Sequence, residues 1–109
     1  MDKNTVEEVR ERLMEKAEEE NIELDELIVF GSRAREDYRE SSDVDVLLVS
    51  PDFEDTNYYK RPRPFYDAWN YDKLPEPEFI CLTPEEFREK REKKPNIVRT
   101  AVEEGVRLA

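Results

Sequence analysis

The chain has 109 residues, with 18 lysines and arginines against 29 aspartates and glutamates, and a net charge of −11. This length suits one domain with a single core, so we expect residues 1–109 to form one domain. The acidic balance argues against extended nucleic acid and membrane surfaces as partners, because the average surface field repels phosphates and anionic headgroups.

Cysteine content and the lack of a targeting signal indicate the compartment. Cys81 is the single cysteine and lies in an apolar run, so no intramolecular disulfide can form and a reducing environment is expected. The polar, acidic N-terminus fits neither a secretory signal nor a transit peptide, and no apolar run reaches transmembrane length. We therefore expect a cytoplasmic protein.

The first expected element is a helix. Apolar residues recur at helical spacing over residues 5–20, which predicts an amphipathic helix with one buried face. Thr5 and Glu8 have the spacing of a capping box at its start, and Asn21 is expected to end it.

Two strands and a turn follow. Residues 24–30 (LDELIVF) end in a continuous apolar run, which predicts a strand covered on at least one face. Gly31 breaks this strand, and residues 32–39 could form a short helix that begins directly after the glycine. Residues 44–49 (VDVLLV) predict the second strand, which Ser50 and a proline close.

The middle of the chain is rich in aromatic residues and gives a weaker signal. Residues 52–76 interleave tyrosine, phenylalanine and tryptophan with Arg-Pro repeats, and a helix could follow Pro64. The aromatic side chains of residues 53–71 could contact a partner, form a lid that stacks on a base, or cover the core. Core covering is the commonest role for aromatic residues in a short domain.

The last third of the chain predicts a strand and two helices. Residues 79–82 form a third apolar strand, and the Thr-Pro-Glu-Glu sequence from Thr83 is a strong helix start, with that helix running to about Lys93. A final helix begins near Asn96 and ends at Gly105, before a terminal strand or tail. This order predicts an α/β (α+β) fold with a small mixed sheet of three to four strands and helices mainly on one face.

Two aspartates in the second strand suggest a metal site. Asp43 and Asp45 are two residues apart, so their side chains leave the same face of a strand with Cα atoms ~6.5–7 Å apart. Burying this pair without a cation would be costly, whereas carboxylate oxygens are preferred ligands of Mg²⁺ and Mn²⁺. The alternative is that both carboxylates are solvated at the strand mouth, with Asp43 capping a turn.

The glycine turn before this strand suggests a phosphate site. Gly31 lets the backbone approach a ligand, and amides at the start of a following helix favour anions. Ser32 can add a hydroxyl contact, while Arg33, Arg35 and Arg39 form a local positive cluster that can neutralise phosphate oxygens. The alternative is an ordinary connection with surface arginines.

These two motifs together carry a family resemblance. Gly-Ser-Arg-Ala-Arg at residues 31–35, followed by Ser-Asp-Val-Asp at residues 42–45 before an apolar run, resembles the signature of the DNA polymerase β-like nucleotidyltransferase superfamily. More narrowly, the chain resembles the minimal nucleotidyltransferases of prokaryotes. The resemblance covers nearly the whole sequence and implies the polymerase β-like nucleotidyltransferase fold.

The resemblance also implies a third carboxylate on a later strand. Glu78 stands at the family's position, directly before the run Phe-Ile-Cys-Leu, whereas its competitor Glu76 lies between two prolines. The alternative for Glu78 is an exposed residue at a strand edge. One departure is plain, because Glu36 replaces the glycine that the family usually has after Arg-Ala-Arg.

The family mechanism assigns roles to these residues. Asp43, Asp45 and Glu78 would bind two Mg²⁺ or Mn²⁺ ions that bridge a nucleoside triphosphate, with ATP as the default, and Glu78 would help deprotonate an acceptor hydroxyl. The resemblance assigns nucleotide binding to the residues of the turn, which are Gly31, Ser32, Arg33 and Arg35.

The resemblance extends to partners. Related minimal enzymes pair with a helical HEPN-type toxin, act as its antitoxin, and in some cases transfer AMP to a tyrosine on it. We expect a partner protein or a homo-oligomer to complete the acceptor site. The alternative from another functional class is a non-catalytic protein that uses the same fold to bind a nucleotide or a partner.

Overall fold

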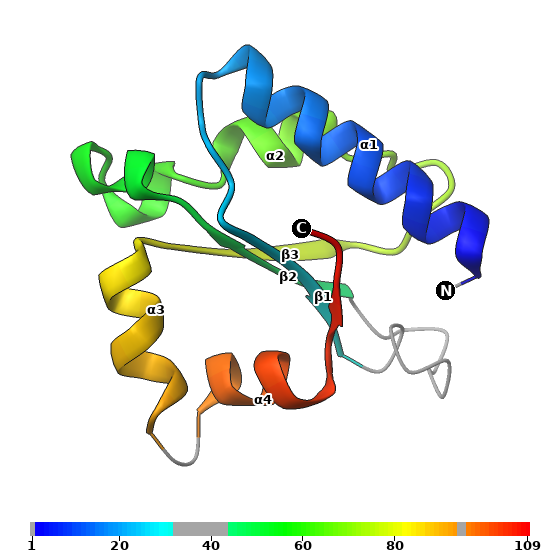
Figure 1. The fold of residues 1–109 in the computed structure, drawn as a ribbon. Helices are drawn as coiled ribbons and strands as arrows, with labels where there is room; N and C mark the ends of the chain where they lie inside the picture. The colour runs from blue at the N-terminus through cyan, green and yellow to red at the C-terminus, as the bar shows by residue number, and fades with distance from the viewer. Residues whose placement is uncertain (1, 32–43, 94–95) are drawn as a thin grey trace.

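The structure is a computed structural model that describes residues 2–31, 44–93 and 96–109, and a four-stranded mixed sheet lies at the centre of this part (Figure 1). Its strands are β1 (Glu26–Phe30), β2 (Val44–Val49), β3 (Pro77–Leu82) and β4 (Val106–Arg107), in the spatial order β3-β2-β1-β4. β1 is antiparallel to both β2 and β4, whereas β2 and β3 are parallel. The predicted α+β fold class and the bounds of the second strand are confirmed.

Both faces of the sheet are buried over β1, β2 and β3, and the apolar residues of these strands alternate between two clusters. On one face the core includes Val29, Val46 and Leu48, together with residues of the first two helices. On the other face Ile28 and Leu47 lie in a second cluster with residues of the last two helices. The continuous apolar runs in β1 and β2 follow from this, because a strand buried on both faces has no polar side to alternate with.

The helices divide evenly between the two faces. In Figure 1, α1 (Lys3–Glu19) and α2 (Arg63–Ala68) lie on one side of the sheet, and α3 (Pro84–Arg91) and α4 (Ile97–Glu104) lie on the other. The expectation that helices lie mainly on one face was therefore wrong. A sheet with apolar side chains on both faces needs cover on both.

The caps of α1 differ from the prediction at one end and agree with it at the other. Asp2, not Thr5, is the N-cap, since its Oδ1 accepts from the Thr5 N–H at 2.8 Å, so the predicted Thr5–Glu8 capping box was wrong. Asn21 lies just past the helix end with φ 57°, the left-handed conformation that asparagine tolerates well. The Ile22 N–H then donates to the Ala17 carbonyl at 2.8 Å, which closes a Schellman motif.

The predicted start of α3 is confirmed in both halves of its capping box. The Glu86 N–H donates to the Thr83 hydroxyl at 3.2 Å, and the Thr83 N–H donates to the Glu86 carboxylate at 2.8 Å. α4 begins after Asn96, whose Oδ1 accepts from the Val98 N–H at 2.7 Å, and Gly105 ends it, as the sequence predicted.

The aromatic segment between β2 and β3 mainly covers the core. It forms two short 3-10 helices, Pro51–Asp55 and Tyr58–Lys60, before α2. Its phenylalanines and its tryptophan are buried, and the rings of Phe65 and Trp69 contact that of Phe79 in β3. The remaining candidates for contact with a partner or a base are its exposed tyrosines, which are Tyr58, Tyr59 and Tyr71.

Arg61 ties this segment to β3 and α3. Its guanidinium donates to the carbonyl oxygens of Thr56 and Cys81 at 3.0 and 3.1 Å, and to the Glu86 carboxylate at 2.8 Å. Burial raises the pKa of the neighbouring Cys81 thiol to about 12, although Arg61 acts to lower it, so this cysteine stays neutral and packs as an apolar residue.

Among the helices of the described residues, none has the length and the apolar composition that a membrane span requires.

Candidate active site

One row of residues across the sheet contains two of the three predicted carboxylates. Phe30 at the end of β1 pairs with Asp45 near the start of β2, and Asp45 in turn pairs with Glu78 near the start of β3. Gly31 directly follows Phe30, so the end of β1 and the starts of β2 and β3 meet at one end of the sheet. Three residues that are far apart in the sequence are thereby brought together.

Asp45 and Glu78 lie on the same face of the sheet. They are register partners in adjacent parallel strands, which run about 4.8 Å apart, and side chains at paired positions leave the same face. The neighbouring positions agree, because Leu47 and Ile80, two residues further along, share one core cluster. Asp45 is half-buried and Glu78 is exposed, so the pair lies where the core gives way to solvent.

The glycine turn has the backbone conformation that requires glycine. Gly31 has φ 95°, which L side chains rarely adopt, and it directly follows Phe30, the register partner of Asp45. The other predicted members of the phosphate site, Ser32, Arg33 and Arg35, lie outside the described residues. Their roles therefore stay predictions, as does the short helix predicted after the turn.

The carboxylate site is described only in part. Asp43 lies outside the described residues, as does Glu36, which replaces the family's usual glycine. Within residues 2–31, 44–93 and 96–109 no group of three or more His, Cys, Asp or Glu side chains could hold a metal ion. The described half, Asp45 with Glu78, offers hard oxygen donors of the kind that Mg²⁺ and Mn²⁺ prefer.

The two candidates for the third carboxylate have different positions. Glu78 is the second residue of β3, whereas Glu76 precedes the strand and its carbonyl accepts from the Val44 N–H at 3.1 Å. The strand register therefore pairs Glu78, rather than Glu76, with Asp45.

A cavity that the sequence did not signal adjoins Glu78. It has a volume of about 240 Å³ and lies between β3 and the facing ends of α3 and α4, with Lys90 and Ile97 in its wall. Its residues come from separate elements and share no sequence pattern, so only the folded chain identifies them.

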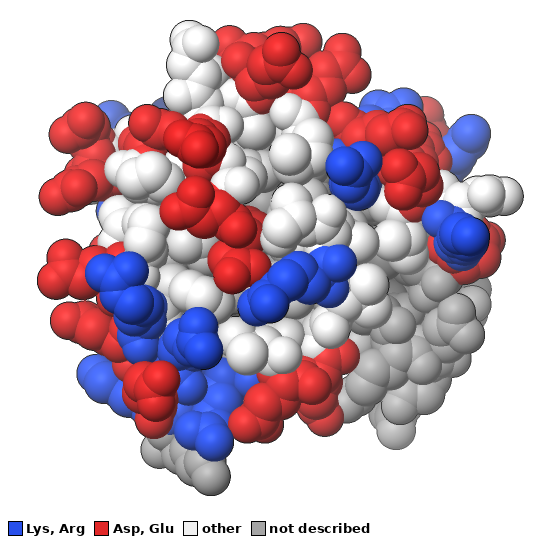
Figure 2. Space-filling model, viewed as in Figure 1, with Lys and Arg blue, Asp and Glu red and all other residues white. Residues whose placement is uncertain are grey.

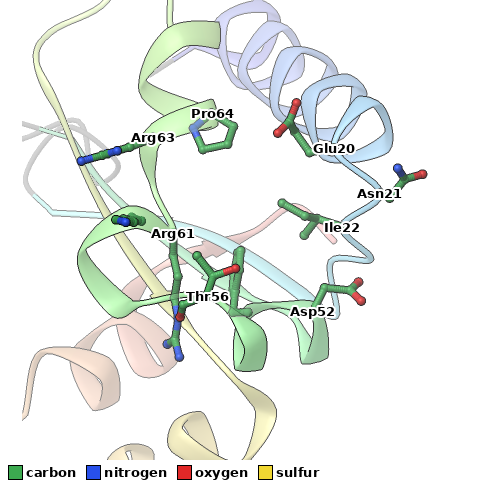
Figure 3. A pocket seen from close by; sticks show the side chains of 10 residues that line it. Glu20, Asn21, Ile22, Asp52, Thr56, Arg61, Arg63 and Pro64 are labelled. Carbon is green, nitrogen blue, oxygen red and sulfur yellow. The ribbon is translucent and has the colours of Figure 1, made fainter.

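A larger cavity, of about 460 Å³, lies at the opposite end of the sheet. Figure 3 shows its lining, which includes Glu20 and Asn21 after α1, and Arg63 and Pro64 at the start of α2. It also includes Asp52, which follows the C-terminal end of β2, whereas Asp45 lies near the N-terminal end of that strand. This cavity is therefore separate from the candidate active site.

Comparison with known proteins identifies the class of this domain. The model of the family described as nucleotidyltransferase domain matches residues 6–108, so the chain belongs to that family. No curated protein sequence matches the chain significantly.

A solved structure supports the same family. The chain is similar to the crystal structure of a predicted nucleotidyltransferase from Sulfolobus solfataricus, with 26% sequence identity, a TM-score of 0.53 and coverage of 82% of each chain. These comparisons support nucleotidyl transfer as the general function. The minimal, toxin-associated type remains a prediction.

Proposed function

We propose that the chain is a metal-dependent nucleotidyltransferase that moves AMP from ATP to a hydroxyl group on a partner protein. The observation that carries this proposal is the pairing of Asp45 with Glu78 on one face of the sheet, beside the positive-φ turn at Gly31. Family membership supports the transfer reaction. The nucleotide, the metal and the acceptor are the proposed parts.

The donor set fits a divalent metal. Asp45 and Glu78 place carboxylate oxygens on adjacent strands, and Asp43, two residues before Asp45 in the sequence, would complete the ligand set. When bound, Mg²⁺ or Mn²⁺ would neutralise the charge that develops on the triphosphate during transfer.

The remaining chemistry is assigned to the chain's own groups. The turn at Gly31 gives phosphates close access to the backbone, and the Ser32 hydroxyl would donate a hydrogen bond to a phosphate oxygen. Arg33 and Arg35 would pair with the other phosphate oxygens and hold pyrophosphate as it leaves. Glu78, at the exposed end of the row, would accept the proton of the attacking hydroxyl.

A helical HEPN-type protein is the proposed acceptor partner in the cytoplasm, with a homo-oligomer as the other way to complete the site. This part rests on the sequence resemblance to minimal nucleotidyltransferases. A protein partner also suits a net charge of −11, which opposes binding of extended nucleic acid.

Label transfer from ATP tests this function. We expect ATP labelled at its α-phosphate to label the partner in the presence of Mg²⁺ and not with EDTA. Asp45→Asn should lower the rate by roughly a hundredfold or more, the usual loss on removing a group that stabilises the transition state. The matched control is Glu76→Gln, which removes a nearby carboxylate outside β3 and should keep the rate.

Two results would contradict the proposal. Transfer that persists in Asp45→Asn would show that other residues carry the reaction. Metal-dependent ATP binding without any transfer, measured by calorimetry, would instead support the non-catalytic binding protein.

A further inference from the structure

The two outer strands of the sheet formed by the described residues differ in how much edge they present. β4, on one side, spans only two residues and gives a further strand little to pair with. β3, on the other side, spans six residues, and its last four are buried. A long outer strand presents a row of backbone N–H and C=O groups with which another chain can pair. β3 therefore needs a protection that β4 does not.

Every second residue of β3 directs its backbone groups toward the outer edge. The Glu76 and Leu82 carbonyls accept hydrogen bonds from N–H groups at the start of β2 and just after its end. In a parallel ladder each residue directs its N–H and C=O to one side, and successive residues alternate between the two sides. Since the even-numbered residues face β2, the residues that face outward are Pro77, Phe79 and Cys81.

Side chains and a proline occupy this outer edge. Pro77 has no N–H to donate. The Phe79 N–H donates to the Tyr66 hydroxyl at 3.3 Å, and the two rings pack edge to face with centroids 4.8 Å apart. The Cys81 carbonyl accepts from the Arg61 guanidinium at 3.1 Å. Both side chains come from the aromatic segment between β2 and β3, which therefore protects the edge as well as covering the core.

The two occupied groups are those that a second copy of the chain would use. Two identical outer strands pair antiparallel about a two-fold axis. With that axis at Ile80, in the middle of the buried run, the Phe79 N–H of one copy would meet the Cys81 carbonyl of the other. Tyr66 occupies the donor of this bond and Arg61 occupies its acceptor. The same side chains in the second copy block the symmetric bond.

We propose that Tyr66 and Arg61 close the outer edge of β3 against pairing with a second copy of this chain. β3 also carries Glu78, so a paired strand would place the second copy beside the candidate active site. Closure of the edge keeps this side of the site accessible. A homo-oligomer that completes the acceptor site must then form through another surface.

The charge of the chain is a second barrier to self-pairing, and it can be separated from the first. The net charge is −11, and Figure 2 shows acidic side chains spread over much of one face. Copies of the chain therefore repel each other at low ionic strength. High salt screens this repulsion, so an experiment in high salt measures the effect of the two side chains alone.

Tyr66→Phe tests the closure, because it removes the hydroxyl and keeps the ring on Phe79. In analytical ultracentrifugation at high salt, this variant should self-associate roughly thirtyfold more tightly than the unchanged chain, which corresponds to about one net hydrogen bond in each of two copies. Tyr59→Phe is the matched control from the same segment. Its side chain is 83% exposed, so the loss of its hydroxyl should leave self-association unchanged.

Hydrogen exchange at the Phe79 N–H locates the contact. At low protein concentration this amide should exchange faster in Tyr66→Phe than in the unchanged chain, because its acceptor is lost. Protection should return as the concentration rises, since the amide then meets the Cys81 carbonyl of a second copy. Adding Arg61→Met should strengthen association further, but Arg61 also stabilises the fold, so the single variant Tyr66→Phe decides the test.

Three results would overturn the inference. Tyr66→Phe could stay as weakly associated as the unchanged chain, which would show that the hydroxyl does not close the edge. It could associate without renewed protection at Phe79, which would place the contact on another surface. The unchanged chain could itself gain protection at Phe79 on concentration, which would show that the edge is open. Each result is independent of label transfer in Asp45→Asn.

Discussion

Arg61 has a side chain that is 7% exposed, and its guanidinium links three segments of the chain. Its partners are the Thr56 carbonyl, the Cys81 carbonyl in β3 and the Glu86 carboxylate in α3. Removing a buried charged donor leaves these acceptors unsatisfied, which costs more than the net strength of the hydrogen bonds themselves. The contribution of Arg61 is therefore structural, although it belongs to an Arg-Pro segment that looks irregular in the sequence.

Arg61→Met should lower the free energy of unfolding by about 3 kcal/mol, because a buried guanidinium and its three hydrogen bonds are lost and the carbonyl acceptors are left unsatisfied. Urea denaturation followed by circular dichroism measures this change. The control is Arg99→Met, which removes an exposed pair with Glu103 and should cost about 0.5 kcal/mol or less. Equal losses in the two variants would contradict the structural role of Arg61.

Glu86 should make the folding stability of the chain decrease as the pH becomes acidic. Partial burial acts to raise the pKa of this carboxyl, but hydrogen bonds from Thr83 and the nearby Arg61 guanidinium outweigh it and hold the pKa below its ordinary value of 4.5. A group whose pKa is lower in the folded state contributes stability above the unfolded value, and loses that contribution as pH falls through the folded value.

Glu86→Gln should therefore reduce stability at neutral pH and flatten the loss of stability that occurs as pH falls below about 4.5, the ordinary value for the group. Thermal unfolding at a series of pH values measures both effects. Glu85→Gln is the neighbouring control, because Glu85 is exposed and lies in the same helical turn. If stability falls as steeply with decreasing pH in Glu86→Gln as in the unchanged chain, this assignment is wrong.

The junction between α4 and β4 depends on close packing at Gly105. A Cβ at this position would lie 2.4 Å from the Ala101 carbonyl oxygen and 2.5 Å from the Ile28 Cγ2, closer than real Cβ atoms approach. The glycine thus lets the chain turn from the helix directly onto β1, where Val106 pairs with Val29.

Gly105→Ala should cost about 1–3 kcal/mol of stability, the usual penalty for overpacking, because backbone and Ile28 must both shift. Hydrogen exchange should show faster exchange at the Leu108 N–H, which donates to the Leu27 carbonyl at 2.7 Å. Val106→Ala, at a side chain that is 41% exposed, should leave this exchange nearly unchanged. Unaltered stability in Gly105→Ala would show that the junction has more room than the structure gives it.

Local signals predicted most element ends, and one failure shows their limit. The Thr83 capping box was predictable because cap, proline and Glu86 all lie within four residues. At α1 the pattern predicted Thr5 as the cap, whereas the helix begins earlier, with Asp2 as its N-cap. Competing caps of similar strength cannot be separated by pattern alone.

The distribution of helices over two faces also lay beyond the local pattern. The apolar runs in β1 and β2 predicted strands that are covered on at least one face, and whether the second face is covered depends on helices distant in the sequence. For the same reason the two-residue β4 was predicted only as a strand or tail, since its pairing with β1 defines it.

At the scale of the whole molecule, strand order and register create the candidate site. The sequence predicted Gly31, Asp45 and Glu78 as site residues, from a glycine turn, a strand with paired aspartates and a family resemblance. Their meeting depends on the antiparallel register of β1 with β2 and the parallel register of β2 with β3, which no short segment encodes. The cavity of about 240 Å³ between β3, α3 and α4 likewise exists only once these two helices cover the same face as Glu78.

Mn²⁺ binding, followed by paramagnetic broadening of amide resonances in the presence of a non-hydrolysable ATP analogue, tests most directly whether Asp45 and Glu78 form one metal site. We predict that broadening centres on Gly31, Asp45 and Glu78, and that Asp45→Asn and Glu78→Gln each remove it while Glu76→Gln does not. Broadening centred instead on Glu85 and Glu89, or on the cavity beside Asp52, would contradict the account.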